Sequence, residues 1–385
     1  MPPTQNFLQS FLHTSRTTLV AATKTTNILP IVIGNESADL DSFASSLLYA
    51  YLTPTRPQPI PFLAIPRADL SLRPEFLHLF HELSLSPSDI LCADDTPSFH
   101  SVPPSALHLH LVDHNVPTLP LPGSQVVGII DHHDDEGHFP SASPRVIEKC
   151  GSCSSLVIRT FLAQSQLRKA DEQSQIARLA LAAVLIDTTD MTQKVTEIDE
   201  AVVQTLLGML PKDWDRKAFY QGVSQAKKDV GSLPLRDLLR KDYKEWAEAN
   251  VCKIGIASVV MGLKWMCSRE ENNTVFMNCL KSYAGEKGLD VLGVMTTDGE
   301  GDEFHRELLL WGMSDVGKEC VQRFENGADD AGLSLGKWGD GELDLVPERK
   351  AWTQGNLAMS RKQVAPFLRE CARGRNDTNK ARAKV

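Results

Sequence analysis

The sequence predicts an α/β protein with two domains, and three observations support this. The chain has 385 residues, which is enough for two domains of ordinary size. In the first half, short β-branched runs alternate with helix-like segments, which is the pattern of a parallel sheet with helices on its faces. A polar stretch at 211–234 divides the chain, and strand-like runs dominate the residues after it. We therefore expect an N-terminal parallel-sheet domain and a smaller mixed α/β domain after it.

The composition is that of a folded globular protein and excludes several other classes. Hydrophobic residues make up 42% and charged residues 23% of the chain. No apolar run approaches the roughly 20 residues that cross a bilayer, so no membrane span is predicted. The net charge of −9 argues against a nucleic-acid partner. The C-x-x-C pair Cys150 and Cys153 has no second pair to complete a zinc site, and a reducing compartment fits best.

The first 30 residues allow two interpretations. They include Arg16 and Lys24, no acidic residue and many hydroxyl residues, which is a composition shared with transit peptides. The apolar spacing within 7–12 also suits a helix that packs on the next domain. We expect a cytoplasmic monomer, with a mitochondrial location as the alternative.

The elements of the N-terminal domain are predicted from local patterns. Leu29–Ile33 is a β-branched run that ends at Gly34, and residues 41–52 come next with helical spacing. Further strands are expected at 107–112 and 126–130, and further helices at 154–167 and 176–186. The resulting domain is expected to span 1–210. Loops at the carboxyl ends of its strands are expected to carry the chemistry.

The second half begins with a polar stretch, 211–234, which we predict to be a helical connector. The domain after it is expected to span 235–372. We expect strands at 253–260, 289–296 and 304–311, a helix at 315–324 and a loop at 327–344. The basic tail 373–385 is predicted to be disordered.

Four clusters of acidic residues, histidine and asparagine come directly after the predicted strands and the long apolar helix. They are Asn35-Glu-Ser-Ala-Asp39-Leu-Asp41, Asp113-His114-Asn115, Asp131-His132-His133 and Asp187-Thr-Thr-Asp190. Carboxylates at the ends of buried elements are costly without a partner, and no lysine or arginine stands beside them in the sequence. Aspartate and histidine without thiolate favour Mn²⁺, Mg²⁺ or Co²⁺, and the number of ligands predicts a centre of two divalent cations.

In residue types and order, these clusters resemble the four motifs of the DHH phosphoesterase superfamily. Ser360-Arg361-Lys362 resembles the basic signature of the DHHA2-type second domain, which family II pyrophosphatases and exopolyphosphatases share. The first motif, the stretch 151–156 and the stretch 240–244 are most similar to the fungal exopolyphosphatase branch. The resemblance covers nearly the whole chain.

The resemblance implies a set of metal ligands and a catalytic pair. Around one ion it places Asn35, Asp39 and Asp113, and around the other Asp41, Asp113, His132 and Asp187. With Asp113 it makes His133 catalytic, since His133 would face the phosphate as a hydrogen-bond donor or general acid. The pyrophosphatases have histidine at the position of Asn35. An amide is a weaker ligand, so the first site is expected to be looser and less selective for transition metals.

Phosphate binding is expected from both domains. The small residues of 151–155 precede a helix, so backbone N–H groups there can approach an anion, although a turn without a ligand is the alternative. In the second domain, a helix begins at Ser360 or at Pro366, and Arg240 is expected to share another helix with a basic residue four positions on. The expected substrate-binding residues are Ser152, Ser154, Lys244, Arg361 and Lys362, together with His133.

Together these features predict an exopolyphosphatase that removes terminal orthophosphate from inorganic polyphosphate with a metal-activated water, in a cleft between the domains. A family II pyrophosphatase is an alternative, but Asn35 and the longer chain point away from it. A prune-like cyclic-nucleotide phosphodiesterase would resemble Asp-His-Arg at the third motif, where this chain has Asp-His-His. A non-catalytic scaffold would be expected to have lost ligands.

Overall fold

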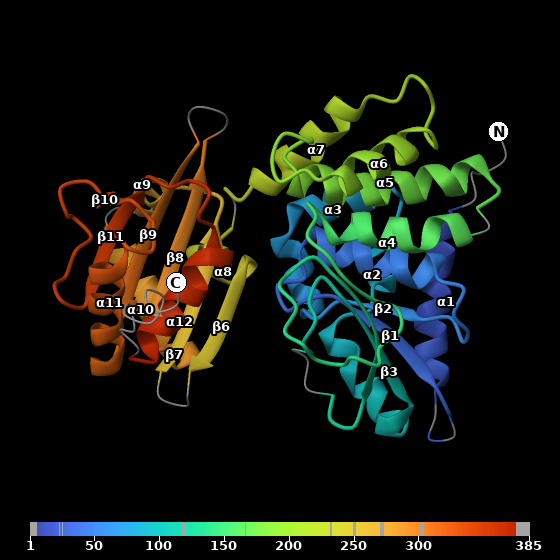
Figure 1. The fold of residues 1–385 in the computed structure, drawn as a ribbon, viewed down its shortest axis with the longest axis horizontal. Helices are drawn as coiled ribbons and strands as arrows, with labels where there is room; N and C mark the ends of the chain where they lie inside the picture. Colours follow the sequence, from blue (N-terminus) through green and yellow to red (C-terminus); the bar gives the residue numbers. More distant parts are fainter. Residues whose placement is uncertain are drawn as a thin grey trace, which may run out of the picture. The chain divides into compact units, whose positions relative to one another are not determined.

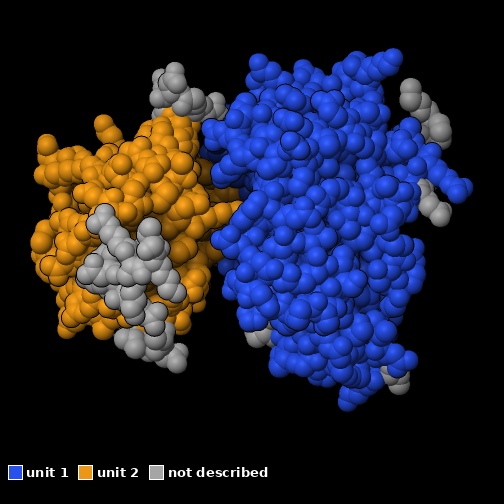
Figure 2. All heavy atoms as spheres, in the orientation of Figure 1, with its two compact units in different colours: residues 1–229 blue, residues 230–385 orange. Residues whose placement is uncertain are grey.

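The computed structural model describes residues 6–22, 24, 26–117, 121–165, 167–231, 233–248, 252–269, 273–299 and 304–374. The chain divides into two compact units, unit 1 at Met1–Asp229 and unit 2 at Val230–Val385 (Figures 1 and 2). Among the described residues, no helix is both long enough and apolar enough to span a membrane.

Unit 1 is built on a five-stranded sheet in the order β2-β1-β3-β4-β5, and every pair in it is parallel. The strands are β1 (Leu29–Ile33), β2 (Ile60–Phe62), β3 (Leu107–Val112), β4 (Gln125–Asp131) and β5 (Arg145–Ile147). The parallel sheet is confirmed, and the strands predicted at 29–33 and 107–112 agree to the residue. Strands β2 and β5 were not predicted, because three residues are too few to show a hydrophobic period.

Seven α-helices surround this sheet within the described residues. They are α1 (Phe7–Ala21), α2 (Leu40–Leu52), α3 (Pro74–Glu82), α4 (Cys153–Phe161), α5 (Ala170–Asp187), α6 (Glu197–Leu207) and α7 (Arg216–Lys228). Short 3-10 turns occupy Arg67–Leu72, Pro87–Asp89, Ala93–Ser101, Pro104–Ala106 and Leu162–Gln164. The helix interpretation of residues 7–12 is the one observed, since Leu8 and Leu12 are buried.

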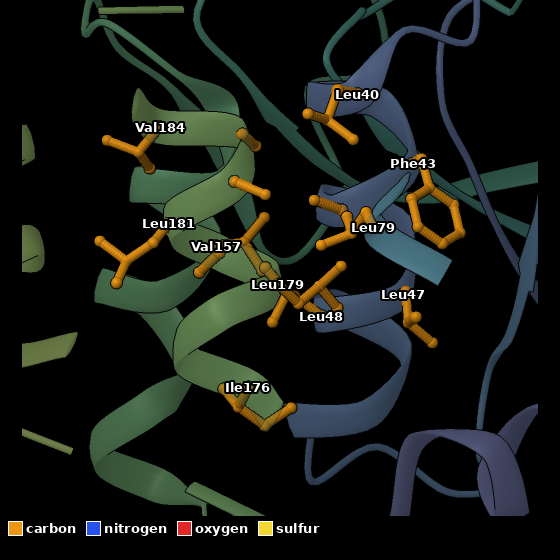
Figure 3. Packing of buried hydrophobic residues seen from close by; sticks show 14 of the residues in the cluster. Leu40, Phe43, Leu47, Leu48, Leu79, Val157, Ile176, Leu179, Leu181 and Val184 are labelled. Carbon is orange, nitrogen blue, oxygen red and sulfur yellow. The ribbon is translucent and has the colours of Figure 1, made fainter. Parts of the chain in front are cut away.

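The core of unit 1 lies on both faces of the sheet, because successive strand residues point to opposite sides. Val32 and Ile130 face the cluster made with α2, α4 and α5. Figure 3 shows Leu48 of α2, Val157 of α4 and Leu179 of α5 packed together in that cluster. Strand residues of the opposite parity belong to a second cluster, which includes side chains from the 3-10 turn 93–101. This packing holds the carboxyl ends of β1, β3 and β4 in a common row.

The stretch predicted as a connector differs from expectation. Helix α7, which lies within it, contacts α3 and α5 and buries Phe219 and Val223. Two large apolar residues spaced four apart are enough to attach this helix to unit 1, so the stretch up to Asp229 is part of that unit.

Unit 2 contains a six-stranded sheet in the order β10-β11-β9-β8-β7-β6. The strands are β6 (Tyr243–Glu248), β7 (Cys252–Val259), β8 (Val291–Asp298), β9 (His305–Gly312), β10 (Leu335–Lys337) and β11 (Arg349–Gln354). Strands β7 and β8 pair in parallel and the other pairs are antiparallel, which confirms the mixed domain. The described helices are α8 (Leu235–Lys241), α9 (Leu263–Ser268), α10 (Asn273–Lys287), α11 (Asp315–Gly327) and α12 (Arg361–Ala372).

Two details of unit 2 differ from the sequence-based predictions, and a third decides between two predicted alternatives. Lys244 lies on β6, whereas Arg240 lies on α8, so the two do not share a helix. The segment 327–344 is not entirely a loop, because β10 pairs with β11 within it. Of the two predicted starts for the last helix, the earlier is observed: Ser360 caps α12 and Pro366 lies inside it.

The predicted disordered tail lies largely outside the described residues. Its first residue, Arg373, is described, and its side chain donates a hydrogen bond to the buried Glu248. Residue 373 is therefore anchored to β6, contrary to the prediction that the tail begins there.

Candidate metal centre

Three neighbouring strands bring the predicted clusters together. Asn35 follows β1, Asp113 follows β3, and His132 and His133 follow β4, which lie side by side in the sheet. One ligand atom from each of Asp113, His132 and His133 falls within 4.8 Å of the others. Because parallel strands end at the same edge, residues about 100 positions apart in the chain meet there.

Asp113 is the most constrained residue of this group. Its φ is 60°, in the left-handed region that non-glycine residues rarely adopt, and such strain persists where the surroundings impose it. Its Oδ2 accepts hydrogen bonds from Asn35 Nδ2 and Ser42 Oγ, both at 2.7 Å. Burial acts to raise its pKa, but the hydrogen bond and charge of His132 outweigh burial and lower the pKa well below the ordinary value.

His132 is held at both ring nitrogens. Its Nδ1 lies 3.1 Å from the carbonyl oxygen of Cys150 and therefore carries a proton that it donates. Its Nε2 lies 3.2 Å from Asp113 Oδ1 and 4.0 Å from Asp41 Oδ2. Burial acts to lower the pKa of His132, but the hydrogen bonds with Asp113 and Cys150 raise it to about 11. A backbone carbonyl on the far nitrogen is the usual support of a metal-binding histidine.

Asp41, in the first turn of α2, is 2% exposed and accepts five hydrogen bonds. The donors are Ser152 Oγ (2.7 Å), Cys153 N (2.6 Å), Ser154 N (2.9 Å), Ser154 Oγ (2.7 Å) and Ser45 Oγ (3.2 Å). The N–H groups at the start of α4 thus bind an anion, as expected, but the anion is this carboxylate of the protein. The hydroxyls of Ser152 and Ser154, which were predicted to bind substrate, donate to Asp41 in this structure, so their predicted role stays untested.

Asp187 and Asp39 complete the acidic group. Asp39 caps α2, and Asp187 is the last residue of α5. Among the described residues, none donates a hydrogen bond to the Asp187 carboxylate. Burial raises the pKa of Asp187 well above its ordinary value, and the negative charges of Asp41 and Asp39 raise it further. The charge of Lys227, on α7, opposes these effects, so a lysine distant in the sequence does stand near one cluster.

These residues fit a divalent cation. Carboxylates that repel one another gain most from a positive ion between them, and the negative charges of Asp41 and Asp39 act on Asp187 in this way. Carboxylate oxygens together with imidazole nitrogen suit Mn²⁺ or Mg²⁺ better than a structural zinc ion.

Asn35 lies beside Asp113, as expected, and both ends of its amide form hydrogen bonds with the protein. Its nitrogen donates to Asp113, while its oxygen accepts from Ser37 N (2.9 Å), Ser37 Oγ (2.9 Å) and Ala38 N (3.2 Å). Turning the amide over would set its NH₂ group against two backbone N–H groups, so this orientation is the favourable one. In this structure Asn35 positions Asp113, and its role as a ligand stays a prediction.

His133 forms a pair with Asp131, a residue that was given no role from the sequence. His133 Nδ1 lies 2.8 Å from Asp131 Oδ1, and Asp131 Oδ2 accepts from Asn115 Nδ2 at 2.6 Å. Asp131 is fully buried; burial raises its pKa, but the hydrogen bond with His133 outweighs burial and lowers it. The His133 side chain is 29% exposed, and its Nε2 has no hydrogen-bond partner among the described residues. That nitrogen is available to a substrate.

Unit 2 carries the predicted cationic residues on different elements. Arg361, in the first turn of α12, donates to the carbonyl oxygen of Asp242 at 3.0 Å and to its Oδ1 at 2.6 Å. Its side chain is only 17% exposed. Lys362 is exposed beside it, and Lys244 lies two residues after Asp242 on β6. Asp242 was not singled out from the sequence, although it stands within the 240–244 stretch.

The fold and the site define a class of two-domain protein, in which a parallel-sheet domain gathers carboxylates and imidazoles at its strand ends. The N-terminal domain of the DHH family matches residues 30–185, and the DHHA2 domain matches residues 221–371. The chain belongs to the DHH family and carries a C-terminal DHHA2 domain.

Individual relatives share most of the chain. A Schizosaccharomyces pombe protein proposed to be an exopolyphosphatase is 36% identical over 88% of this chain and 89% of its own. Exopolyphosphatase PRUNE1 of Mus musculus is 28% identical over 91% of this chain and 77% of its own. The crystal structure of a Methanococcus jannaschii protein, proposed to be a family II inorganic pyrophosphatase, matches with a TM-score of 0.60 at 18% identity and covers 89% of this chain and 99% of that one. The last likeness shows a shared fold.

Proposed function

We propose that the protein is a metal-dependent exopolyphosphatase that releases terminal orthophosphate from inorganic polyphosphate. The observation that carries the proposal is that His132 lies beside both Asp113 and Asp41, while the negative charge of Asp41 also acts on Asp187. The names of the relatives from Schizosaccharomyces pombe and mouse support the same activity. The proposed reaction is the hydrolysis of a phosphoric anhydride.

We propose that the centre takes two divalent cations, Mn²⁺ or Mg²⁺, with Co²⁺ as a substitute. Asp39, Asp41, Asp113, His132 and Asp187 would hold them, and His132 must lose its Nε2 proton to do so. Ions held by these residues would supply an activated water and would neutralise charge on the phosphoryl group. A Deinococcus radiodurans relative is described as a probable manganese-dependent inorganic pyrophosphatase. It is 25% identical over 55% of this chain and 64% of its own.

His133 is the proposed hydrogen-bond donor or general acid. Asp131 accepts from Nδ1 and so fixes the orientation of the ring, which leaves Nε2 to donate a proton to a phosphate oxygen. The rigidity of Asp131 follows from its own bonds with Asn115 and the His133 backbone. Asp131 and Asn115 together therefore hold the His133 ring, and with it Nε2, in place.

The cationic groups of unit 2 are the proposed site for neighbouring phosphates. Asp242 holds Arg361 through Nη1 and Nη2, which leaves its remaining N–H groups to a phosphate. Lys362 and Lys244 would add point charges. We propose that unit 1 binds the metal ions and that unit 2 binds the polyphosphate chain.

We further propose a cytoplasmic monomer whose partner is inorganic polyphosphate, with no nucleic-acid or membrane partner. A mitochondrial location remains the alternative, since the composition of the first 30 residues suits either.

Phosphate release from long-chain polyphosphate, tripolyphosphate, pyrophosphate and a cyclic nucleotide, measured with Mg²⁺ and then with Mn²⁺, tests this function. Release that is fastest from polyphosphate supports it. A preference for pyrophosphate favours a family II pyrophosphatase, the second candidate, which the fold of the Methanococcus jannaschii protein suggests. A preference for the nucleotide favours a phosphodiesterase. No turnover with any substrate by protein that binds Mn²⁺ would contradict the proposal and favour a scaffold.

A further inference from the structure

Asp199 lies outside the four motifs and is a fully buried carboxylate, with an exposed fraction of 0%. A buried charge of this kind is costly unless every lone pair finds a donor. Its Oδ2 accepts from Gly151 N (2.8 Å), Thr196 N (2.9 Å) and Thr196 Oγ1 (2.8 Å). Its Oδ1 accepts from Ser155 Oγ at 2.7 Å.

These four bonds serve two purposes. Those with Thr196 belong to the capping box of α6 and explain an aspartate at the third helical position. Those with Gly151 and Ser155 reach residues 48 and 44 positions away and contribute nothing to capping. Asp199 thus holds both ends of the segment 151–155.

That segment carries the donors of one candidate ligand and adjoins the support of another. Between its two ends, Ser152, Cys153 and Ser154 donate four hydrogen bonds to Asp41. Immediately before it, the carbonyl of Cys150 accepts the Nδ1 proton of His132. A single chain of contacts therefore runs from Asp199 through the segment to both residues.

Gly151, at the start of the segment, is closely surrounded by other described residues. A Cβ on Gly151 would lie 2.4 Å from Thr188 Cγ2 and 3.0 Å from both Asp199 Oδ2 and the carbonyl oxygen of Lys194. Thr188 directly follows Asp187, a third candidate ligand. The turn after it holds three consecutive residues in the left-handed region, with φ of 50°, 52° and 65° at 189, 190 and 191. Gly151 is thus packed against Thr188, the residue between Asp187 and this turn.

We propose that Asp199 is a positioning residue of the metal centre, which keeps Asp41 and His132 oriented by holding the segment 151–155 at both ends. This inference rests on the proposed function only in taking those two residues as ligands. Removing outer partners of metal ligands typically weakens metal binding 10- to 100-fold.

Calorimetric titration of Mn²⁺ into the full-length protein tests the proposal. Asp199→Ala should bind Mn²⁺ about 10- to 100-fold more weakly than the wild type. Asp199→Asn should restore binding to nearly that of the wild type, because its oxygen can accept from Gly151 while its NH₂ group donates to Ser155. Thr196→Ala is the matched control: it disturbs the cap of α6 and lowers thermal stability, but it leaves the bonds to the segment and therefore the Mn²⁺ affinity intact.

Ser155→Ala keeps the test decisive if Asp199→Ala fails to fold. It removes one of the two bonds to the segment and should weaken Mn²⁺ binding severalfold. Thr160→Ala, which removes a hydroxyl bonded only to the backbone of the same helix, should not. Wild-type Mn²⁺ affinity in folded Asp199→Ala or in Ser155→Ala would overturn the proposal, as would equal weakening by Thr196→Ala.

Mn²⁺ titration and phosphate release, measured on the same proteins, distinguish failure of this proposal from failure of the proposed function. Weakened Mn²⁺ binding in the variants, together with no phosphate release from polyphosphate by the wild type, would contradict the function and leave the role of Asp199 standing. Failure of the wild type to bind Mn²⁺ would overturn both.

Discussion

At the scale of single residues, the side chain at position 35 determines what that residue can bind, and asparagine and histidine differ in this respect. An imidazole at position 35 offers a nitrogen to an ion, whereas the amide present here donates to Asp113 and accepts from its own loop. The amide thus satisfies three groups of the protein before any ion arrives. Position 35 therefore shapes the centre through Asp113.

Asn35→His should tighten Mn²⁺ binding and shift relative turnover toward pyrophosphate, because imidazole suits Mn²⁺ and a short substrate depends more on the metals. It should also lower the free energy of unfolding of the metal-free protein by about 1–3 kcal/mol, since the N–H groups of Ser37 and Ala38 lose their acceptor. Calorimetry with Mn²⁺, urea unfolding in EDTA and the ratio of the two turnovers measure these effects. An unchanged Mn²⁺ affinity would show that position 35 does not reach the ions.

Asp41 and Asp187 are both proposed ligands, but their surroundings differ. Asp41 accepts five hydrogen bonds, while Asp187 accepts none from the described residues and is repelled by Asp41 and Asp39. Asp41→Ala and Asp187→Ala should each abolish hydrolysis. Only Asp41→Ala should destabilise the metal-free protein, by about 3–5 kcal/mol, because it leaves buried N–H groups without an acceptor. Asp187→Ala should be neutral or stabilising.

Urea unfolding of both variants in EDTA decides between these outcomes, with phosphate release measured at saturating Mg²⁺. Near-normal turnover by either variant would contradict the two-metal proposal. Equal stabilities would contradict the contrast drawn from their hydrogen bonds.

At the scale of elements, strand ends and helix starts build the centre. Strands β1, β3 and β4 end in one row, and the N-terminus of α4 points its N–H groups at Asp41 rather than at a substrate. A carboxylate at a helix N-terminus is favoured by the helix dipole, so this contact both fixes the ligand and starts the helix. The start of α12 is arranged differently, since Arg361 is held there by Asp242 against the unfavourable dipole.

Asp242→Asn should loosen Arg361, because the side chain keeps its shape but loses the charge that pairs with the guanidinium. We expect the KM for polyphosphate to rise about three- to tenfold with little change in Mn²⁺ affinity. Asp237→Asn is the matched control, since it removes a similar pair with Arg240 on α8. Steady-state kinetics and calorimetry measure both quantities. If the KM values of the two variants rise equally, general loss of charge rather than Arg361 is responsible.

His110, on β3, makes stability depend on pH. Burial lowers its pKa to about 4, and its Nδ1 lies 2.8 Å from the Tyr49 hydroxyl. The unfolded chain, with a histidine pKa of about 6.5, binds the proton first as the pH falls. The free energy of unfolding should therefore decrease by about 3 kcal/mol between pH 7 and pH 4 through this residue alone.

Urea unfolding of the wild type and of His110→Phe across that range in EDTA measures the contribution of His110. At pH 7 the wild type should have the larger free energy of unfolding, because the variant lacks the contact with Tyr49. As the pH falls, this difference should shrink and then reverse, because the variant has no histidine at position 110 that could be protonated on unfolding. His81→Gln, on the exposed side of α3, should follow the wild type. If the free energies of unfolding of the wild type and of His110→Phe depend on pH in the same way, His110 is not buried in its neutral form.

At the scale of the whole molecule, the chain has two units with separate hydrophobic cores. We propose that one binds the metal ions and the other binds polyphosphate. Every candidate metal ligand lies in unit 1, and Lys244, Arg361 and Lys362 lie in unit 2. Binding of metal and binding of the polyphosphate chain should therefore be separable by mutation.

Lys362→Ala should weaken polyphosphate use about tenfold and leave Mn²⁺ affinity unchanged, because the residue belongs to the other unit. Lys281→Ala, an exposed lysine on α10, is the control for net charge. Kinetics with polyphosphate and calorimetry with Mn²⁺ give the two values. A large loss of Mn²⁺ binding in Lys362→Ala would mean that the basic signature supports the metal centre directly.

Local sequence patterns by themselves determined three strands of each sheet, several of the helices and the residue types of the centre. Strands 29–33 and 107–112 are β-branched or alternating runs, and the clusters stand directly after them, so a parallel sheet implies that they meet. Helix ends were less certain: α4 ends at Phe161, six residues before the predicted end, and α5 begins at Ala170, six residues before the predicted start. The resemblance of the four motifs then identified the family.

Only the tertiary structure decided which donor meets which acceptor. Ser152 and Ser154 bind Asp41 across 111 and 113 positions of the chain, and Asp199 binds Gly151 across 48. Lys244 belongs to a strand because β7 pairs with it, not because of its neighbours in the sequence. Hydrogen bonds between distant segments depend on how helices and strands pack, and no local period or spacing records that packing. The orientation of the Asn35 amide and the role of Asp199 therefore became visible only in the folded chain.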